Sequence, residues 1–294
     1  MWQALNWKDY ELLDASDGER LERWGDYILI RPDPQVIWKG VKKHPAWKTP
    51  HATYRRSKSG GGAWQENRLP DEWQIRFPLS PRQMTLVVKP MGFKHTGVFP
   101  EQATNWSWFS RLIGGAGRPI RVLNLFAYTG GATVAAAAAG AQVCHVDAAK
   151  GMVAQAKRNA ALSGLADAPI RYIVDDCKKF IERELRRGNR YDAIIMDPPS
   201  YGRGPNGEIW KLEEQISDFL SLAVQVLSDK PLFVLLNSYT TGLSAATMGY
   251  LLQMAMAKRG GQVTAEEIGL PVTATGGTLP CGASARWTAE EDKR

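Results

Sequence analysis

The chain of 294 residues has few of the side chains that build disulfide frameworks and metal sites. Its three cysteines, Cys144, Cys177 and Cys281, lie far apart, and no pair has the spacing of metal ligands. An odd number of cysteines also argues against a disulfide framework. The four histidines form no ligand cluster in the sequence. We therefore expect neither a disulfide scaffold nor a bound metal.

Long hydrophobic runs are missing as well. No uninterrupted apolar stretch reaches the roughly 18 residues that a membrane-spanning helix needs. Residues 1–14 lack the basic start and the apolar core of a signal peptide. Hydrophobic residues nevertheless make up 44% of the chain, which allows a sizeable core and excludes general disorder. These features predict a cytoplasmic protein that has no membrane contact.

Acidic residues are outnumbered, with 30 Asp and Glu against 37 Lys and Arg, which gives a net charge of +7. A basic balance favours an anionic partner such as nucleic acid, although a basic solvated surface explains this excess equally well. The excess is concentrated in residues 38–68, where cations alternate with aromatic residues and which include three consecutive glycines, Gly60 to Gly62. The basic residues are Lys39, Lys42, Lys43, Lys48, Arg55, Arg56, Lys58 and Arg68, and the aromatic ones are Trp38, Trp47, Tyr54 and Trp64.

Cations that contact phosphates, combined with aromatic rings that stack on bases, are typical of surfaces for looped or single-stranded RNA. Residues 38–68 therefore predict an RNA partner. The alternative is a solvated loop whose tryptophans belong to a small core.

The composition changes near residue 118. Before it, the sequence is rich in tryptophan, proline and basic residues, and short strand-like runs at 27–30 and 84–88 are separated by glycine and proline. We predict a β-rich substrate-binding region over residues 1–83 and a connecting segment over 84–117.

After residue 118, strand-like and helix-like segments alternate, which predicts an α/β fold with a doubly wound parallel sheet. The catalytic domain is predicted over 118–294. Strands are expected at 120–125, 142–146, 170–174, 193–196, 231–236, 262–268 and 283–288. Helices are expected in the alanine-rich segment that ends at 139, and at 150–162, 178–187, 212–227 and 244–258.

Ligands of doubly wound sheets bind at the carboxyl ends of the strands. A glycine pair, Gly130 and Gly131, follows the first predicted strand of this domain, and such a turn permits a close backbone approach to a ligand. Asp147 follows the second strand and Asp176 the third. Each carboxylate is suited to a ribose hydroxyl or an adenine amino group, or is alternatively a helix cap. Together these residues predict a cleft that holds an adenosine.

The fourth strand ends in Asp197-Pro198-Pro199. The two prolines cannot continue the sheet, so the strand stops with an exposed carboxylate and stiff backbone carbonyls. This arrangement suits an amino group or a ring edge beside a cofactor. A nicotinamide enzyme is disfavoured because the Gly-x-Gly-x-x-Gly fingerprint is missing, and no Gly-Lys-Ser/Thr turn supports a phosphate-binding loop.

At these residues the sequence resembles the class I S-adenosylmethionine-dependent methyltransferases. It is most similar to the group that contains the bacterial large-subunit ribosomal RNA cytosine methyltransferases. The resemblance covers residues 84–288 and is carried by segments 94–102 and 124–131, by Asp147 and Asp176, and by Asp197-Pro198-Pro199. It implies a Rossmann-like sheet of seven strands with the last one antiparallel, and S-adenosyl-L-methionine as the cofactor.

The resemblance also implies two sets of site residues. The cofactor-binding set is Phe99, Gln102, Phe126, Ala127, Tyr128, Thr129, Gly130, Gly131, Asp147, Ala148, Asp176, Cys177 and Asp197. The catalytic set is Asp197, Pro198, Pro199 and Tyr201. Asp147 is expected to hold the ribose and Asp176 the adenine, while Asp197 and the Pro198 carbonyl border the methyl group.

The sequence departs from the family pattern at three places. Phe126 and Tyr128 stand where the commoner version has glycine, which predicts a different route for the loop. Ser200 separates Tyr201 from the prolines, which puts stacking of Tyr201 on the target in doubt. No cysteine occurs in residues 237–242, where relatives that methylate cytosine C5 carry the thiolate nucleophile. Cys281 is either a substitute nucleophile or an incidental buried thiol.

Our interpretation is a methyltransferase that acts on a base of ribosomal or other RNA. A methyltransferase for a small molecule or a protein side chain is the alternative. A non-catalytic RNA-binding protein is a third possibility, against which the intact acids argue. Residues 202–210 are expected to form a lid over the substrate, or else a surface loop anchored by Trp210. The oligomeric state stays open, with a homodimer among the options.

Overall fold

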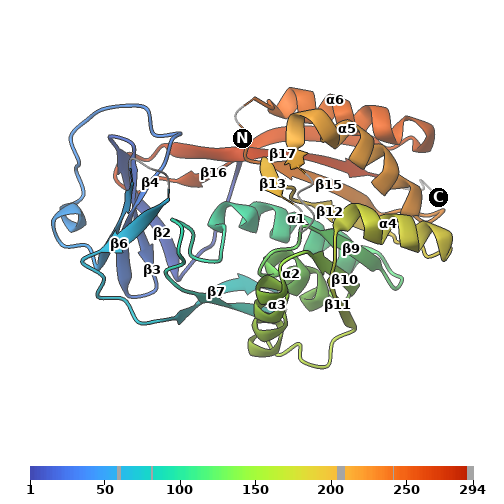
Figure 1. Ribbon diagram of the computed structural model, residues 1–294, viewed down its shortest axis with the longest axis horizontal. Helices are drawn as coiled ribbons and strands as arrows, with labels where there is room; N and C mark the ends of the chain where they lie inside the picture. The colour runs from blue at the N-terminus through green and yellow to red at the C-terminus, as the bar shows by residue number, and fades with distance from the viewer. Residues whose placement is uncertain (58–60, 81, 204–208, 241, 290–294) are drawn as a thin grey trace. The chain divides into compact units, whose positions relative to one another are not determined.

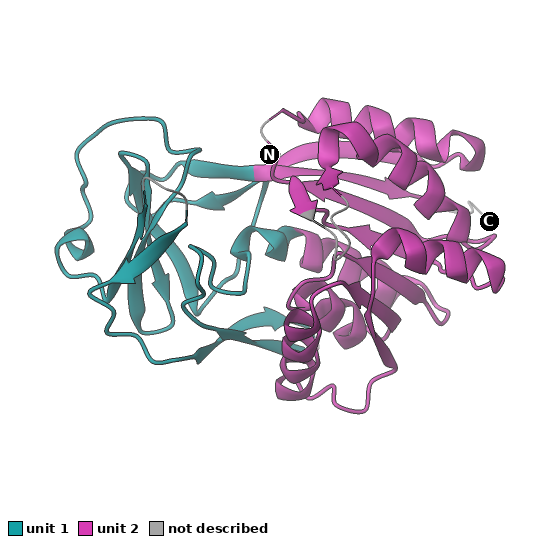
Figure 2. Cartoon of the chain, viewed as in Figure 1, with its two compact units in different colours: residues 1–104, 268–281 teal, residues 105–267, 282–294 magenta. Residues whose placement is uncertain are grey.

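The computed structural model describes residues 1–57, 61–80, 82–203, 209–240 and 242–289; for Arg203 it describes the backbone alone. The chain divides into two compact units (Figure 2). Unit 1 consists of Met1–Thr104 and Ile268–Cys281, and unit 2 consists of Asn105–Glu267 and Gly282–Arg294. The chain therefore enters unit 1 twice, once at its beginning and once near its end.

Unit 1 is built mainly from short strands (Figure 1). A five-stranded sheet has the order β2-β3-β4-β5-β6, and β7 and β8 form a separate antiparallel pair. This confirms the β-rich N-terminal region. The strands are β1 (Trp2–Gln3), β2 (Tyr10–Ser16), β3 (Glu19–Trp24), β4 (Tyr27–Pro32), β5 (Ala52–Arg56), β6 (Gly62–Gln65), β7 (Trp73–Leu79) and β8 (Arg82–Val88). Short 3-10 helices cover Pro45–Lys48 and Pro100–Gln102.

A buried carboxylate connects three strands of unit 1. Glu22 on β3 is fully buried and accepts hydrogen bonds from Arg31 at 2.6 and 2.8 Å and from the Tyr10 hydroxyl at 2.8 Å. Burial alone would raise the pKa of Glu22, but the charges of Arg20 and Arg31 outweigh it and lower the pKa to about 2. The carboxylate thus stays ionised and joins β2, β3 and β4.

Unit 2 contains the predicted doubly wound sheet. Its strands have the order β16-β17-β15-β12-β9-β10-β11, in which β9 to β12 and β15 pair in parallel and β17 is antiparallel to β15. The predicted antiparallel last strand is confirmed, and the two-residue strand β1 pairs in parallel with β16 at the edge of the sheet, so that the sheet has eight strands rather than the seven predicted. The strands are β9 (Arg121–Leu125), β10 (Gln142–Asp147), β11 (Ile170–Val174), β12 (Ala193–Met196), β15 (Phe233–Ser238), β16 (Gln262–Pro271) and β17 (Thr278–Thr288).

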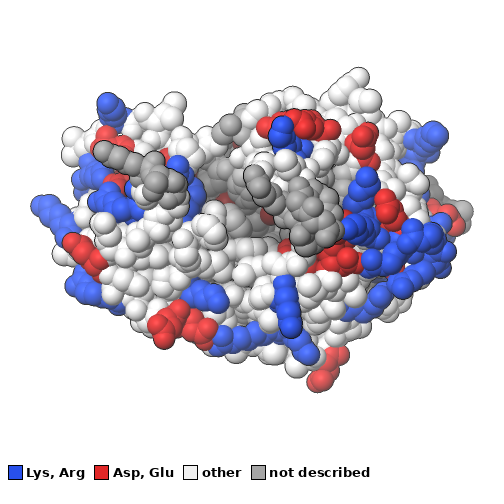
Figure 3. Space-filling view, viewed as in Figure 1, with Lys and Arg blue, Asp and Glu red and all other residues white. Residues whose placement is uncertain are grey.

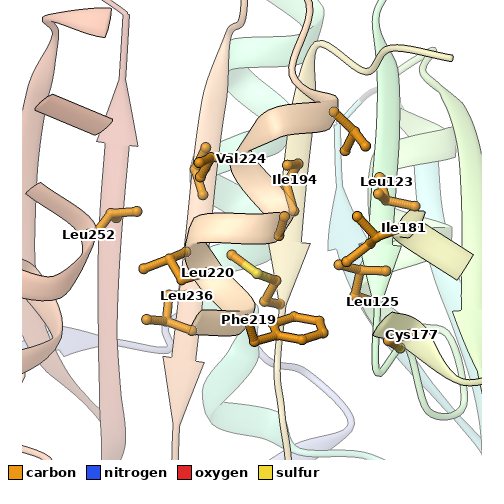
Figure 4. Close-up of a cluster of buried hydrophobic side chains, with 14 of the residues drawn as sticks. Leu123, Leu125, Cys177, Ile181, Ile194, Phe219, Leu220, Val224, Leu236 and Leu252 are labelled. Atoms are coloured by element: carbon orange, nitrogen blue, oxygen red, sulfur yellow. The ribbon is translucent and has the colours of Figure 1, made fainter. Parts of the chain in front are cut away.

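Helices cover both faces of this sheet (Figure 1). On one face, α4, α5 and α6 share a hydrophobic cluster with the central strands, in which Leu123 and Ile194 meet Phe219 and Leu220 (Figure 4). The other face carries α2, whose residues 133–138 are all buried, and α3. The helices are α1 (Ala103–Gly115), α2 (Gly131–Ala138), α3 (Lys150–Leu162), α4 (Cys177–Arg186), α5 (Leu212–Ala223) and α6 (Ala245–Met256).

Some predicted boundaries were wrong. The helix predicted over 212–227 ends at Ala223, because Val224–Val226 tighten into a 3-10 turn. The last strand begins at Thr278 rather than at 283, since its first residues belong to unit 1.

The expected lid over residues 202–210 contains two short strands, β13 (Tyr201–Arg203) and β14 (Ile209–Lys211), which pair antiparallel. Residues 204–208 of that segment lie outside the described residues.

Candidate active site

Three neighbouring strands of unit 2 end at nearly the same level. Met196 of β12 is paired with Leu125 of β9, and Leu125 is paired with Val146 of β10. The residues that follow directly are Asp197, Phe126 and Asp147. Adjacent strands are about 4.8 Å apart, so the backbones at Asp197 and Asp147 lie on the order of 10 Å apart. The predicted acids thus share one edge of the sheet.

The loop after β9 keeps the left-handed backbone that favours glycine, although it carries aromatic residues. Phe126 has φ 54° and Tyr128 has φ 50°. The different route that we expected for this loop stays a prediction. Such angles are uncommon for bulky residues and store strain on the order of 1–3 kcal/mol. Packing of the Phe126 ring against Trp210 and Phe219, with centroids 5.5 and 5.2 Å away, offsets part of it.

The glycine pair has a packing reason. Gly130 has φ 82°, and a Cβ there would lie 2.6 Å from the Cβ of Ala156 on α3. A Cβ on Gly131 would lie 2.7 Å from the ring of Trp106 on α1. The two glycines therefore let the start of α2 pack closely on both helices. They hold the loop in place whether or not a ligand also approaches it.

Asp147 ties the loop to the end of β10. Its Oδ2 accepts from the backbone N–H of Tyr128, and its Oδ1 accepts from that of Ala149, both at 2.8 Å. Each carboxylate oxygen has a second lone pair, so the half-buried Asp147 keeps the capacity to accept from hydroxyl groups. The neighbouring Ala148 is exposed. This geometry fits the ribose role that was predicted for Asp147.

Asp176 is the N-cap of α4, where its Oδ1 accepts from the Lys179 N–H at 2.9 Å. The capping alternative is therefore observed, and since Asp176 is exposed it leaves room for a second interaction. The thiol of Cys177, the first residue of α4, is buried and accepts from the Phe126 N–H at 3.3 Å. That thiol connects the helix to the loop after β9.

Asp197 is held by a residue that sequence reasoning missed. Its Oδ1 accepts from the side-chain amide of Asn237, on β15, at 2.7 Å. We considered residues 237–242 only as a segment without cysteine. A signal was present, because Asn237 and Ser238 end a strand that is otherwise apolar, and both are buried.

Further hydrogen bonds fix residues 198–201, the rest of the predicted catalytic segment. Pro198 is buried, and the carbonyl of Pro199 accepts from the Trp210 indole N–H at 2.6 Å. The Ser200 hydroxyl accepts from Thr240 at 2.6 Å. Tyr201 is the first residue of β13 and is 51% exposed, so it is not part of the core.

Phe99 and Gln102 belong to unit 1, unlike the other predicted site residues. Gln102 is buried at the end of the 3-10 helix Pro100–Gln102, and the Phe99 ring lies 5.2 Å from the imidazole of His95. Their predicted contact with the cofactor stays a prediction.

All three cysteines are buried. Burial raises the pKa of Cys144 to about 11, and it raises the pKa of Cys177 as well. Burial and then the charge of Glu101 raise the pKa of Cys281 well above its usual value. Each thiol is therefore protonated near neutral pH, and the structure favours the buried-thiol alternative for Cys281.

The aromatic residues in 38–68 are largely engaged within unit 1. Tyr54 is buried edge-on against Trp64, whose indole N–H donates to the Met91 carbonyl. Trp47 donates to Asp14, and Trp38 donates to a backbone carbonyl while it stays 41% exposed. Most of these rings therefore act as a small core, as the alternative interpretation held.

Several cations of the same stretch remain available. Lys42 and Arg55 form ion pairs with Glu19. Five others are exposed and form no ion pair within the described residues: Lys39, Lys43, Lys48, Arg56 and Arg68, of which Arg68 donates a hydrogen bond to the Pro50 carbonyl at 2.6 Å. Lys58 lies outside the described residues. Lys and Arg also gather over α4 in unit 2 (Figure 3), where Lys178 and Arg186 are exposed.

Two kinds of feature are absent from the described part of the chain. No group of three or more His, Cys, Asp or Glu side chains is placed there to hold a metal ion. No helix within these residues is both long and apolar enough to cross a membrane.

Comparison with known proteins identifies relatives of this chain. A family model for S-adenosylmethionine-dependent methyltransferases matches residues 88–212. The chain is 31% identical over 242 residues to the ribosomal RNA large subunit methyltransferase K/L of Shewanella frigidimarina, covering 74% of this chain and 32% of that protein. It is 30% identical to the ribosomal RNA large subunit methyltransferase I of Klebsiella pneumoniae, covering 57% of this chain and 40% of that one. The chain thus spans about a third of the length of the K/L relatives it matches.

A crystal structure agrees over nearly the whole chain. The S-adenosylmethionine-dependent methyltransferase from Agrobacterium tumefaciens is 36% identical, and the two structures superpose with a TM-score of 0.91. The match covers 98% of this chain and 93% of that one. Given this match and the acidic strand ends described above, the chain belongs to the S-adenosylmethionine-dependent methyltransferases.

Proposed function

We propose that this methyltransferase transfers the methyl group to a nitrogen atom of an RNA base, in ribosomal RNA. The names of the curated relatives support the RNA substrate. The state of the thiols supports nitrogen over carbon: methylation of cytosine C5 needs a thiolate, and all three thiols are buried with raised pKa values. A nitrogen acceptor attacks the methyl group directly and needs no such nucleophile.

The cofactor site that we propose follows the edge of the sheet. Asp147 binds the ribose hydroxyls through the free lone pairs of its carboxylate. Asp176 accepts from the adenine amino group while it caps α4, and the backbone of Ala148 and Cys177 borders the ring. The loop from Phe126 to Gly131 passes the methionine part, and the contacts of Phe99 and Gln102 with the cofactor stay a prediction.

The chemistry rests on positioning. When bound, S-adenosylmethionine supplies a methyl group on a sulfonium, which a lone pair attacks with little acid–base help. A carboxylate oxygen of Asp197 accepts a hydrogen bond from the acceptor nitrogen and so points its lone pair toward the methyl group. The Pro198 carbonyl borders the same point, and Pro199 and the exposed Tyr201 contact the base. Holding both reactants in line contributes about 7–11 kcal/mol.

The RNA backbone has candidate contacts in unit 1. We assign phosphate binding to the exposed cations Lys39, Lys43, Lys48 and Arg56, which have no internal ion-pair partner among the described residues. Trp38, at 41% exposed, is the ring of this stretch best placed to stack on an unpaired base. Because the other rings are packed, we expect charge rather than stacking to dominate the affinity.

Transfer of a labelled methyl group tests the proposal. The protein is incubated with tritiated S-adenosylmethionine and with RNA, protein or small-molecule fractions from cells that lack the gene. We expect label in large-subunit ribosomal RNA, and an N-methylated base after digestion to nucleosides. Label in protein or in small molecules would support the alternative acceptors, and C5-methylcytosine would contradict the nitrogen assignment.

The Asp197→Ala variant tests the site itself. We expect the maximal rate of transfer to fall by about 10²- to 10⁴-fold, and the affinity for S-adenosylmethionine to fall much less. The matched control is Asp218→Ala on α5, a carboxylate that is exposed on the surface of unit 2. Equal rates in the Asp197 variant and the wild type would rule out the assigned role.

A further inference from the structure

A continuous chain of side-chain hydrogen bonds runs through unit 2 and ends at Asp197. Arg286 donates through Nε and Nη2 to the Asn105 carbonyl oxygen at 3.0 and 2.7 Å. The Asn105 amide donates to the Ser284 hydroxyl at 2.9 Å, and that hydroxyl donates to the Asn237 carbonyl oxygen at 2.7 Å. The Asn237 amide then donates to the Asp197 carboxylate at 2.7 Å.

The direction of this chain is fixed by chemistry. A guanidinium only donates, so Asn105 must turn its oxygen toward Arg286 and its amide toward Ser284. The serine hydroxyl has one hydrogen and gives it to the oxygen of Asn237. Asn237 is thereby left with its amide facing Asp197, whose Oδ1 accepts the hydrogen bond. Every bond donates from the cation toward the carboxylate, and aligned bonds of this kind polarise one another.

The chain is buried where packing alone would favour apolar side chains. Asn105 and Ser284 are fully buried, Asn237 is 1% exposed and Arg286 is 7% exposed. Asn237 and Ser284 are direct cross-strand partners between β15 and β17. Burial and the nearby Arg111 lower the pKa of Arg286 to about 9, which still leaves the guanidinium charged at neutral pH. A buried cation and two buried amides cost desolvation energy, which calls for a function beyond packing.

We propose that Asn237 is a positioning residue for methyl transfer, and that Ser284, Asn105 and Arg286 hold its amide in the orientation that fixes the Asp197 carboxylate. The inference rests on the proposed role of Asp197. Asn237 does not touch the substrate; it limits rotation of the carboxylate so that the acceptor nitrogen meets a fixed oxygen. A misplaced carboxylate slows the chemical step but leaves binding intact, because small errors in alignment are costly for the rate alone.

The test compares single-turnover rates and affinities in variants of the full chain. Asn237→Leu keeps the volume and removes the donor, and we expect the rate to fall about 10- to 100-fold. The dissociation constants for S-adenosylmethionine and RNA should stay within about threefold. Ser284→Ala removes one buried oxygen atom and should lower the rate in the same direction by less, while Ser284→Thr, which keeps the hydroxyl, should restore it. A loss of affinity in proportion to the rate would indicate a structural role and overturn the proposal.

A matched control comes from the opposite end of β12. Tyr191→Phe deletes a buried hydrogen bond, from the tyrosine hydroxyl to Glu184 at 2.6 Å, far along the strand from Asp197. We expect this variant to lose stability and to keep its rate. An equal fall in rate for Tyr191→Phe and Ser284→Ala would mean that any buried polar deletion slows transfer, which would contradict the specific role.

A double-mutant cycle separates this inference from the proposed function. In the Asp197→Ala background, adding Asn237→Leu should cause no further fall in rate. A full additional fall would show that Asn237 acts independently of Asp197. If Asp197→Ala lowers the rate and Asn237→Leu does not, the positioning role fails while the proposed site stands. If Asp197→Ala itself has no effect, the proposed function fails first.

Discussion

Single residues decide how the loop after β9 is built. Gly131 contacts α1 so closely that any side chain would collide with the ring of Trp106. Phe126 and Tyr128 both have strained backbone angles. Ring packing against Phe219 stabilises Phe126, and the hydrogen bond from the backbone N–H to Asp147 stabilises Tyr128. The glycine pattern that indicated a ligand loop is thus explained in part by helix packing, and the two explanations can be separated.

Gly131→Ala should destabilise the protein by about 1–3 kcal/mol, since its Cβ would lie 2.7 Å from Trp106. Gly151→Ala on α3 is the matched control, because its Cβ would meet nothing within 4 Å. The control should stabilise the protein by up to about 1 kcal/mol through helix propensity. Urea denaturation measures both. A neutral Gly131→Ala would show that the helices move apart easily.

The buried carboxylate of unit 1 gives a second prediction. Glu22→Gln keeps the shape but leaves Arg31 without its carboxylate partner and Arg20 with Asp33 alone, at a cost of about 3–5 kcal/mol. Thermal unfolding should therefore begin at a much lower temperature. Glu19→Gln on the same strand, whose two ion pairs are more exposed, should cost less than about 1 kcal/mol. Similar losses in both variants would contradict the importance of burial.

At the level of elements, the start of α4 combines two roles in one side chain. Asp176 caps the helix, and we assign it to adenine as well. A serine caps as well as an aspartate does but has a shorter side chain without charge. The two roles are therefore separable by substitution.

Asp176→Ser should keep the free energy of unfolding within a few tenths of a kcal/mol of wild type, while Asp176→Ala should lose about 1 kcal/mol. Both variants should bind S-adenosylmethionine more weakly, as measured by calorimetry. Wild-type affinity in the serine variant would show that Asp176 is only a cap.

The interface of β10 with α2 predicts a pH dependence of stability. His145 is fully buried, its Nδ1 pairs with the Thr133 hydroxyl at 2.9 Å, and burial lowers its pKa to about 4. As the pH falls below 6.5, His145 becomes protonated in the unfolded chain but stays neutral in the folded protein. The free energy of unfolding therefore falls between pH 6.5 and 4. The loss should reach about 2 kcal/mol at pH 5.

His145→Gln should remove this contribution, so that its stability changes less between pH 7 and pH 5 than that of the wild type. Denaturant titrations at the two pH values measure the difference. Parallel pH dependences in the two proteins would mean that His145 does not carry the effect.

Helices and strands could be predicted from the sequence where local residue patterns determine them. The helix over 150–162 matches α3 residue for residue, and the acids at the strand ends lie at one edge of the sheet as expected. Hydrogen bonds between residues far apart in the sequence could not be predicted. Asn237 meets Asp197 across forty residues of sequence, and Arg286 meets Asn105 across 181. The predicted division into substrate-binding, connecting and catalytic regions stays a prediction.

At the scale of the whole molecule, basic surfaces exist in both units, and the proposed function assigns RNA to the one in unit 1. Replacing Lys39, Lys43, Lys48 and Arg56 by Gln should weaken RNA binding. It should also lower the log–log salt slope by up to about 2.8, or about 0.7 for each RNA phosphate that the variant no longer neutralises. Filter binding across a salt series measures this slope.

The control for that experiment replaces Lys178 and Arg186 on α4 by Gln. We expect these changes to leave the salt slope nearly unchanged. A larger effect from the α4 variants than from the unit 1 variants would move the RNA surface to unit 2 (Figure 3).

Unit 1 is completed by a segment late in the chain, Ile268–Cys281. Trp2 and Gln3 pair with Ile268 and Gly269, and Leu12 forms a bridge with Val272. During synthesis on a ribosome, the first hundred residues therefore emerge long before the segment that finishes their fold. This protein cannot fold strictly from its N-terminus onward, as chains of independent domains do. A nascent chain halted before residue 268 would expose the unpaired edge of β1, and a fragment made of residues 1–104 alone would be a poor module for transplantation into another enzyme.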